Sequence, residues 1–304
     1  MAIRDEFNVG TADRVNFGVC IKPDDAYRIA AADAAVQRTL IQILSLTMDS
    51  LEGMEGDWEE YDVSEDYGIP RKVNMRRADP LAAKLYQLYD MDGLPDVGNI
   101  MDHVQNVKFY FAHFWDREGN KAVGLSKTIR FKASLSSNGR LLQWKDNTLK
   151  VVDGGVLTLD RFFDAIITNN RVYMAKPRPV EQVADIVAEV AATAQAKIDE
   201  IQAAMPFLDL SLIRRDIANH PRLARLAASI AKRADLADIK QEKLVEVCEQ
   251  HAILLRPLDG LLRPKRTNET ALLEVLDDRR YSTQLTEADA IPFRASGRQK
   301  VVRA

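Results

Sequence analysis

The pattern of hydrophobic and polar residues along the chain changes its period twice. Between residues 107 and 175, short runs with a two-residue period are separated by turn residues, which predicts antiparallel β-strands. From residue 179 to residue 276, apolar residues recur mostly at steps of three and four, which predicts helices. We therefore expect an α+β fold: an antiparallel β-sheet with N-terminal helices, followed by a mostly helical C-terminal half. The expected domains are a sheet region, residues 1–178, and a helical region with an extended C-terminal tail, residues 179–304.

The clearest strand signal is a hairpin between Leu157 and Met174. Residues 165–168 and 171–175 are apolar runs on either side of Asn169-Asn170. Asparagine tolerates the positive φ that a two-residue type I′ turn requires, so these residues predict a β-hairpin with that turn. The hairpin should complete a sheet of five or six strands. The other strands are expected at residues 14–21, 108–115, 122–131, 141–144 and 149–152.

Helices are predicted on both sides of the strand region. Asp24 or Asp25 can cap a helix that continues to about Leu51, and Pro80 is expected to open a second, short helix. Residues 179–205 form the longest amphipathic segment, and their apolar seam fits either a core within the same chain or an intermolecular coiled coil. The remaining helices are expected at residues 210–219, 222–234, 240–251 and 268–276.

Two stretches of the C-terminal half are not predicted to form helices. Residues 254–266 contain Pro257 and Pro264, which would break a helix, so a structured loop is expected there. The chain beyond Tyr281 is expected to be extended. Between the last helix and this tail, residues 277–280 (Asp-Asp-Arg-Arg) are expected to form ion pairs.

The charged residues are unevenly distributed. The net charge of the chain is −3, but residues 1–100 hold 10 Lys and Arg against 19 Asp and Glu, which leaves 32 against 26 for residues 101–304. Residues 101–304 are therefore the part of the chain that could bind a polyanion. Eight carboxylates lie between Glu52 and Asp66 without a basic residue, which is typical of a solvated loop, although an acidic lid or a partner-docking loop would have the same composition.

Composition excludes several classes of protein. No apolar run approaches the roughly 20 residues of a membrane-spanning helix, and the first ten residues lack the features of a signal peptide. Cys20 and Cys248 are too few for a disulfide framework or a four-thiolate zinc site, so we expect a cytoplasmic location.

Three basic clusters are candidates for a nucleic-acid surface. On an ideal helix, Arg222, Arg225, Lys232 and Arg233 share one face, and such a row of cations can follow phosphates without reading base sequence, although a solvated helix face has the same pattern. Residues 263–266 and residues 127–132 supply the other clusters. The candidate DNA-binding residues are Lys127, Arg130, Lys132, Arg222, Arg225, Lys232, Arg233, Arg263, Lys265 and Arg266.

Signals for catalysis are weak. The four histidines are scattered without metal-ligand spacing, and no phosphate-binding glycine loop or nucleophile elbow is present. Asp160 and Asp164 are one helical turn apart and could hold a metal, but a capping role for Asp160 and a hydrogen-bonding role for Asp164 are favoured. We therefore expect no catalytic residues, no metal and no cofactor.

Two motifs resemble the KwaB family of the Kiwa anti-phage defence system. The first includes Asp160, Phe162, Phe163, Asp164, the apolar strand, Asn170 and the pair Val172-Tyr173. The second is ALLEVLDDRRY, residues 271–281, followed by a short tail rich in Ser, Arg and Lys. One position departs from the family, because Val180 stands where an aromatic residue is expected.

This resemblance implies a bacterial antiviral defence effector that binds double-stranded DNA without sequence specificity. It further implies a homodimer that acts with a membrane-embedded partner and is recruited through it to the inner membrane. Such an effector would interfere with phage replication or transcription by occupying DNA. Two other classes remain open: a protein-only adaptor that uses the acidic segment and the seam helix, and a metal-dependent nuclease.

Overall fold

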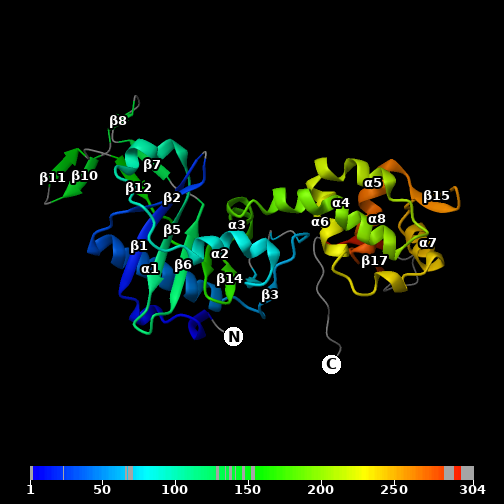
Figure 1. Cartoon of the computed structure of the whole chain (residues 1–304), viewed down its shortest axis with the longest axis horizontal. Helices are drawn as coiled ribbons and strands as arrows, with labels where there is room; N and C mark the ends of the chain where they lie inside the picture. Colours follow the sequence, from blue (N-terminus) through cyan, green and yellow to red (C-terminus); the bar gives the residue numbers. More distant parts are fainter. Residues whose placement is uncertain are drawn as a thin grey trace. The chain divides into compact units, whose positions relative to one another are not determined.

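Two compact units make up the computed structural model of the chain. Unit 1 comprises Met1–Tyr61 and Ile69–Ala184, and unit 2 comprises Asp62–Gly68 and Asp185–Ala304. The fold is α+β, as predicted, with the main sheet in unit 1 and most helices in unit 2 (Figure 1). The structure describes residues 3–283 and 291–295, apart from residues 23, 66, 68–70, 128–129, 134, 137–138, 141, 146–147 and 152–154.

An eight-stranded sheet forms the centre of unit 1, and its strand order is β2-β1-β5-β6-β13-β14-β4-β3. Neighbouring strands are antiparallel, except for the parallel pair β3 and β4. The strands are β1 (Arg14–Ile21), β2 (Ala26–Ala30), β3 (Glu59–Glu60), β4 (Val73–Arg76), β5 (Val107–Trp115), β6 (Lys121–Ser126), β13 (Ala165–Ile167) and β14 (Arg171–Met174).

The segment between β6 and β13 forms three separate antiparallel pairs, so the prediction of one strand at residues 122–131 is wrong. The first strand ends at Ser126, because the next backbone N–H, that of Lys127, donates to the Asp164 carboxylate at 2.8 Å instead of to a neighbouring strand. The pairs are β7 (Arg130–Ala133) with β12 (Gly155–Thr158), β8 (Leu135–Ser136) with β9 (Gly139–Arg140), and β10 (Leu142–Lys145) with β11 (Thr148–Val151).

The first helix, α1 (Ala34–Glu52), begins nine residues later than the sequence predicts from a cap at Asp24. Its N-cap is Asp33, whose side chain accepts a hydrogen bond from Val36 N at 2.8 Å. The preceding residues form β2 instead, and Tyr27 on that strand packs edge-to-face against Phe109 and Phe111 of β5. Tertiary packing against the sheet thus outweighs the local helical pattern.

Helices cover both faces of the main sheet. The buried side of α1, which includes Leu40, Leu44 and Met48, packs against the face that carries Phe17 and Tyr110. The second helix, α2 (Ala83–Asp90), follows a 3₁₀ turn that starts at Pro80, as predicted. It lies on the opposite face, where its Leu88 carbonyl is 3.1 Å from the Nε2 atom of His113.

The predicted hairpin between residues 165 and 175 is confirmed, but its turn type is wrong. β13 and β14 pair from Ala165 with Met174 to Ile167 with Val172. Asn169 and Asn170 both lie in the described part of the chain, and neither has a positive φ. Contacts from elsewhere in unit 1 hold the turn instead: Glu6 accepts from Asn170 N, and Arg77 donates to the Asn169 side chain.

The helix predicted at residues 179–205 is interrupted. It consists of α3 (Pro177–Val183) in unit 1 and α4 (Ile186–Ala204) in unit 2. Asp185 between them has a φ of 53°, which an α-helix does not accommodate. Along α4, Val190, Ala194 and Ile198 are buried and the helix packs against α6, so its apolar seam serves the core of its own unit.

Unit 2 combines helices with two short antiparallel ribbons. The loop predicted at residues 254–266 is a hairpin, because Asp259 and Gly260 both have positive φ and form its two-residue turn. The further elements are α5 (Ser211–Asp216), α6 (Pro221–Ile230), α7 (Gln241–Gln250), α8 (Glu269–Leu276), β15 (Leu255–Leu258), β16 (Leu261–Pro264), β17 (Arg280–Thr283) and β18 (Ile291–Arg294). No helix within the described residues has the length and apolar character that crossing a bilayer requires.

Replacing Gly124 with alanine should destabilise unit 1, because a Cβ atom there would lie 2.5 Å from the ring of Phe163. Overpacking of this kind costs about 1–3 kcal/mol, which urea denaturation can measure. In the Phe163→Ala background, Gly124→Ala should cost less, because the ring is absent. An equal cost in both backgrounds would contradict the steric explanation.

Candidate nucleic-acid interface

The basic face predicted for residues 222–234 is not a continuous exposed surface. α6 ends at Ile230, so Lys232 and Arg233 lie beyond the helix. The Ser229 hydroxyl is buried and donates to Asp62 at 3.2 Å, and the Arg225 guanidinium donates to the Val63 carbonyl at 3.0 Å. A segment of the acidic stretch therefore covers this side of α6 within unit 2.

The prediction that residues 52–66 form a solvated loop is consequently wrong for residues 62–65. Val63 is fully buried, and Ser64 accepts a hydrogen bond from the buried guanidinium of Arg279. Arg279 also lies 2.6 Å from Asp277 and 3.6 Å from Glu65. The ion pairs expected among residues 277–280 are present, and they fix this segment in unit 2.

Three arginines surround one buried carboxylate, that of Glu274 on α8. Its side chain is 1% exposed, and its Oε1 atom lies 2.6 Å from Arg222 of α6 and 3.1 Å from Arg294 of β18. Its Oε2 atom accepts two hydrogen bonds, at 2.9 and 3.0 Å, from Arg280 of β17. The Glu274 cluster, as we call these four residues, therefore holds three guanidinium groups against one carboxylate.

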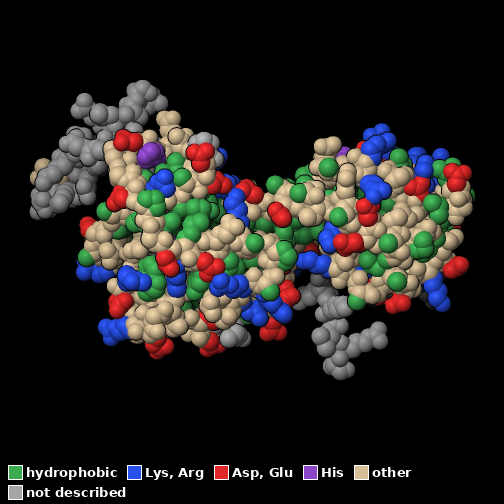
Figure 2. Space-filling model, viewed as in Figure 1, with side chains coloured by type: hydrophobic (Ala, Val, Ile, Leu, Met, Phe, Trp, Pro, Cys, Tyr) green, Lys and Arg blue, Asp and Glu red, His purple; other side chains and the backbone are tan. Residues whose placement is uncertain are grey.

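This imbalance makes the Glu274 cluster a potential phosphate site. The side chains of Arg222 and Arg294 are 54% and 50% exposed, so both can be reached from solvent while they contact Glu274. A guanidinium has five N–H donors, and one contact with a carboxylate leaves donors for a phosphate oxygen. On the face seen in Figure 2, basic and acidic side chains are interspersed over each unit.

Arg233 has a structural role instead. Its guanidinium contacts Asp235 and Asp278, at 2.8 and 2.7 Å, and donates to the Leu276 carbonyl at 2.6 Å. Its side chain is 12% exposed, which leaves little surface for a ligand. Lys232, in contrast, is exposed.

The second predicted cluster is divided among different partners. Arg263 pairs with Asp209, and Arg266 lies 3.5 Å from Asp216. Lys265, between them, is exposed. Arg263 and Arg266 each have their own carboxylate partner, so their positive charge is neutralised more completely than that of the three arginines around Glu274.

The third predicted cluster lies in unit 1. Lys127 is half-buried and follows the end of β6, whereas Arg130 and Lys132 belong to β7. The side chains of Arg130 and Lys132 lie outside the described part of the structure.

Asp164 has the hydrogen-bonding role predicted for it. Besides Lys127 N, its carboxylate accepts from the Ser126 hydroxyl at 3.3 Å and lies 2.9 Å from the Lys176 ammonium. The capping role predicted for Asp160 is wrong, because residues 160–164 form no helix. Among the residues that the structure describes, no group of three or more His, Cys, Asp and Glu side chains could hold a metal ion.

The two thiols are poorly suited to nucleophilic chemistry. Burial raises the pKa of Cys20 to about 12, and burial raises the pKa of Cys248 to about 11. The thiolate is the nucleophilic form of cysteine, and both side chains are protonated at neutral pH.

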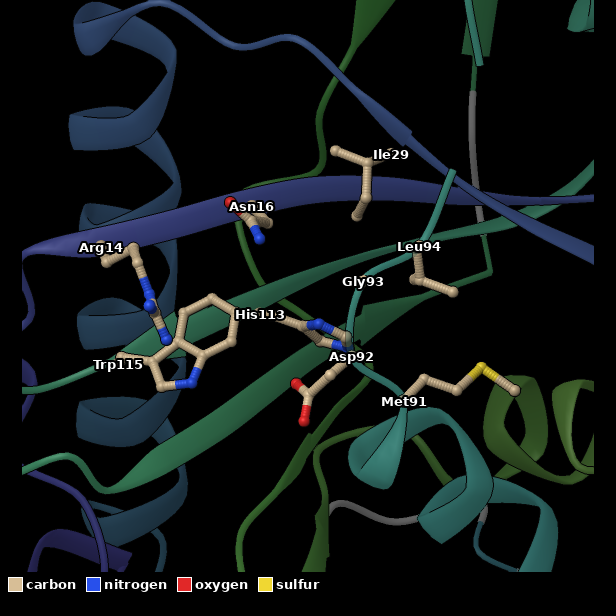
Figure 3. Close-up of a pocket in the computed structure, with 9 residues that line it drawn as sticks. All are labelled: Arg14, Asn16, Ile29, Met91, Asp92, Gly93, Leu94, His113 and Trp115. Carbon is tan, nitrogen blue, oxygen red and sulfur yellow. The ribbon is translucent and has the colours of Figure 1, made fainter. Parts of the chain in front are cut away.

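Unit 1 contains a polar pocket of about 510 Å³ that sequence reasoning did not find (Figure 3). Its floor is the β1–β5 ladder, where Arg14 pairs with Trp115 and Asn16 with His113. The Arg14 guanidinium lies 3.8 Å from the centre of the Trp115 ring. Residues 91–94, which include Asp92, form the rim, so guanidinium, amide, indole and carboxylate groups converge in a volume suited to a small polar ligand.

His113 is held neutral beneath this pocket. Its burial, together with the nearby positive charge of Lys121, lowers its pKa to about 4. A neutral ring that contacts the Leu88 carbonyl through Nε2 carries its proton on that atom. His113 is therefore a neutral, buried ring of the sheet near pH 7.

The family model for Kiwa protein KwaB-like proteins matches residues 104–286, which is more than half of the chain. The chain belongs to the KwaB-like family. The resemblance found from residues 160–173 and 271–281 is thereby confirmed, and the match includes Arg222, Glu274 and Arg280. Searches of curated proteins and of solved structures found no match.

Among the arginines of the KwaB-like chain's Glu274 cluster, sequence reasoning found Arg222 but missed the other two, and it did not single out Glu274. Arg280 belongs to the motif at residues 271–281, where it was assigned to ion pairing alone. Arg294 pairs with Arg280 across β17 and β18. Had the pairing of residues 280–283 with residues 291–294 been predicted, Arg280 and Arg294 would have been recognised as neighbours.

The stability of unit 1 should decrease as the pH falls from about 6.5 toward 4. An unfolded histidine takes up a proton near pH 6.5, whereas folded His113 takes it up only near pH 4, so acid favours unfolding. The shift corresponds to about 3 kcal/mol. Urea denaturation at several pH values should show a weaker pH dependence for His113→Gln than for the wild type, and equal dependences would contradict this assignment.

Proposed function

We propose that this KwaB-like protein is a DNA-binding effector of a Kiwa anti-phage defence system. Family membership supports the role in Kiwa defence. In the proposal, the protein binds double-stranded DNA without sequence specificity and interferes with phage replication or transcription by occupying the DNA. It acts as a homodimer with a membrane-embedded partner, which recruits it from the cytoplasm to the inner membrane.

The observation that supports DNA binding most directly is the charge excess of the Glu274 cluster. Exposed arginines can displace the counterions that surround duplex DNA, and this release favours binding at low salt. Contacts with phosphates position a protein on DNA but carry no information about base sequence. Arg222 and Arg294, each about half exposed, are therefore the residues we assign to the phosphate contacts.

The residues expected to affect DNA affinity therefore differ from those predicted from the sequence. Arg225 donates to Val63 and Arg233 contacts two carboxylates, so their replacement should reduce stability more directly than DNA affinity. Lys232 and Lys265 are exposed and can add weaker, non-directional attraction.

The double replacement Arg222→Ala and Arg294→Ala should weaken binding to duplex DNA by roughly 10-fold or more at low salt. Each lost phosphate contact should also reduce the slope of log affinity against log salt by about 0.9. Gel-shift titration at several salt concentrations measures both quantities, and thermal unfolding shows whether each variant is folded.

Arg4→Ala is the matched control for this experiment. Arg4 is 48% exposed and also forms ion pairs, but its partners are two carboxylates, Asp49 and Glu52. Around Arg4, carboxylates outnumber guanidiniums, which is the opposite of the Glu274 cluster. Replacing Arg4 should therefore leave the affinity for duplex DNA nearly unchanged. Equal losses in the control and the double variant would refute the assignment.

The same titration with plasmid DNA separates the three classes of function. A salt-sensitive gel shift without nicking of the plasmid supports an effector that acts by occupying DNA. The absence of a shift supports the protein-only adaptor, and magnesium-dependent cutting supports a nuclease.

A further inference from the structure

An exposed pair of aromatic rings lies on the ribbon formed by β17 and β18. Tyr281 and Phe293 are cross-strand partners, and their ring centroids are 5.6 Å apart with an angle of 20° between the ring planes. They remain 47% and 43% exposed. Two large side chains therefore present a flat apolar surface to solvent, although burying it would be favourable.

The next cross-strand pair on the same ribbon consists of Arg280 and Arg294 of the Glu274 cluster. Successive residues of a β-strand point to opposite faces, so the two arginines face Glu274 while the two rings face away from it. Consecutive Cα atoms are about 3.8 Å apart, which places the cationic pair and the aromatic pair next to each other along the ribbon. The half-exposed guanidinium of Arg294 is thus close to the base of the aromatic surface.

The chemistry of this neighbourhood favours a nucleic acid over a protein as the ligand. Three guanidiniums face one carboxylate on the opposite face of the same ribbon, and the half-exposed Arg294 directly follows Phe293 in the strand, so the surroundings of the apolar surface suit a polyanion. Proteins that bind single strands combine positive charge along the backbone with aromatic side chains on which bases stack. Inside a duplex, both faces of each base are already covered by neighbouring bases.

We propose that Tyr281 and Phe293 form a stacking platform for unpaired bases, on a DNA strand whose phosphates contact Arg222 and Arg294. This inference rests on the proposed DNA-binding function and narrows its substrate to DNA with single-stranded segments, such as duplex ends with overhangs. The arginines provide general affinity for DNA, and the rings provide the preference for unpaired bases.

The test compares a blunt duplex with the same duplex extended by a single-stranded overhang, using fluorescence anisotropy and the full-length protein. Stacking of one base on an aromatic side chain corresponds to a gain of roughly 5- to 100-fold in affinity. The wild type should bind the overhang DNA more tightly by a factor in that range. A 2-aminopurine in the overhang should also be quenched on binding, because its fluorescence decreases when it stacks.

The decisive variant is Tyr281→Ala combined with Phe293→Ala. It should lose the preference for overhang DNA and the quenching, while its affinity for the blunt duplex stays within about twofold of the wild type. Tyr281→Phe retains a ring and should keep both properties. Leu254→Ala with Leu258→Ala is the matched control, because Leu258 at the end of β15 and Leu254 just before that strand are exposed apolar side chains of unit 2.

The possible failures are distinguishable. If the wild type binds neither DNA, the proposed DNA-binding function fails and this inference fails with it. If it binds both DNAs equally and quenches no 2-aminopurine, only the stacking platform is overturned. If the aromatic variant keeps the overhang preference but changes oligomeric state in light scattering, the rings form a protein contact, which also overturns the proposal.

Discussion

The burial of the Glu274 carboxylate is the constraint on which the arrangement of unit 2 depends. A charged group removed from water destabilises a fold unless partners compensate for its lost hydration. Glu274 is 1% exposed, and its compensation comes from α6, β17 and β18 together. The ion pairs that satisfy this carboxylate thereby bring three arginines, far apart in the sequence, to one place, and two of them remain accessible to a ligand.

Local patterns predicted those parts of the fold whose residues are stabilised by near neighbours. β5, α2 and the β13–β14 hairpin follow from period-two or helical spacing and from turn residues close in sequence. The start of α1 was misplaced because β2 depends on packing against β1 and β5. The break between α3 and α4 at Asp185 has no comparable local signal, since the surrounding residues continue a helical pattern.

The candidate site shows the same distinction between local and distant contacts. A helical projection places Arg222, Arg225 and Arg233 on one polar face, but it assumes that water covers that face. Residues 62–65 occupy part of it instead, although Val63 lies 162 positions before Arg225 in the sequence. The identity of the exposed arginines is therefore a property of the tertiary structure, whereas the positive balance of residues 101–304 was visible from composition.

Protection of individual arginines from chemical modification tests the central claim most directly. Phenylglyoxal labelling of the wild-type protein, read by peptide mass spectrometry with and without duplex DNA, requires no substitution and no change in folding. The account predicts that DNA protects Arg222 and Arg294 at low salt, that high salt removes this protection, and that Arg4 reacts equally in both samples. Equal reactivity of Arg222 and Arg294 with and without bound DNA would contradict it.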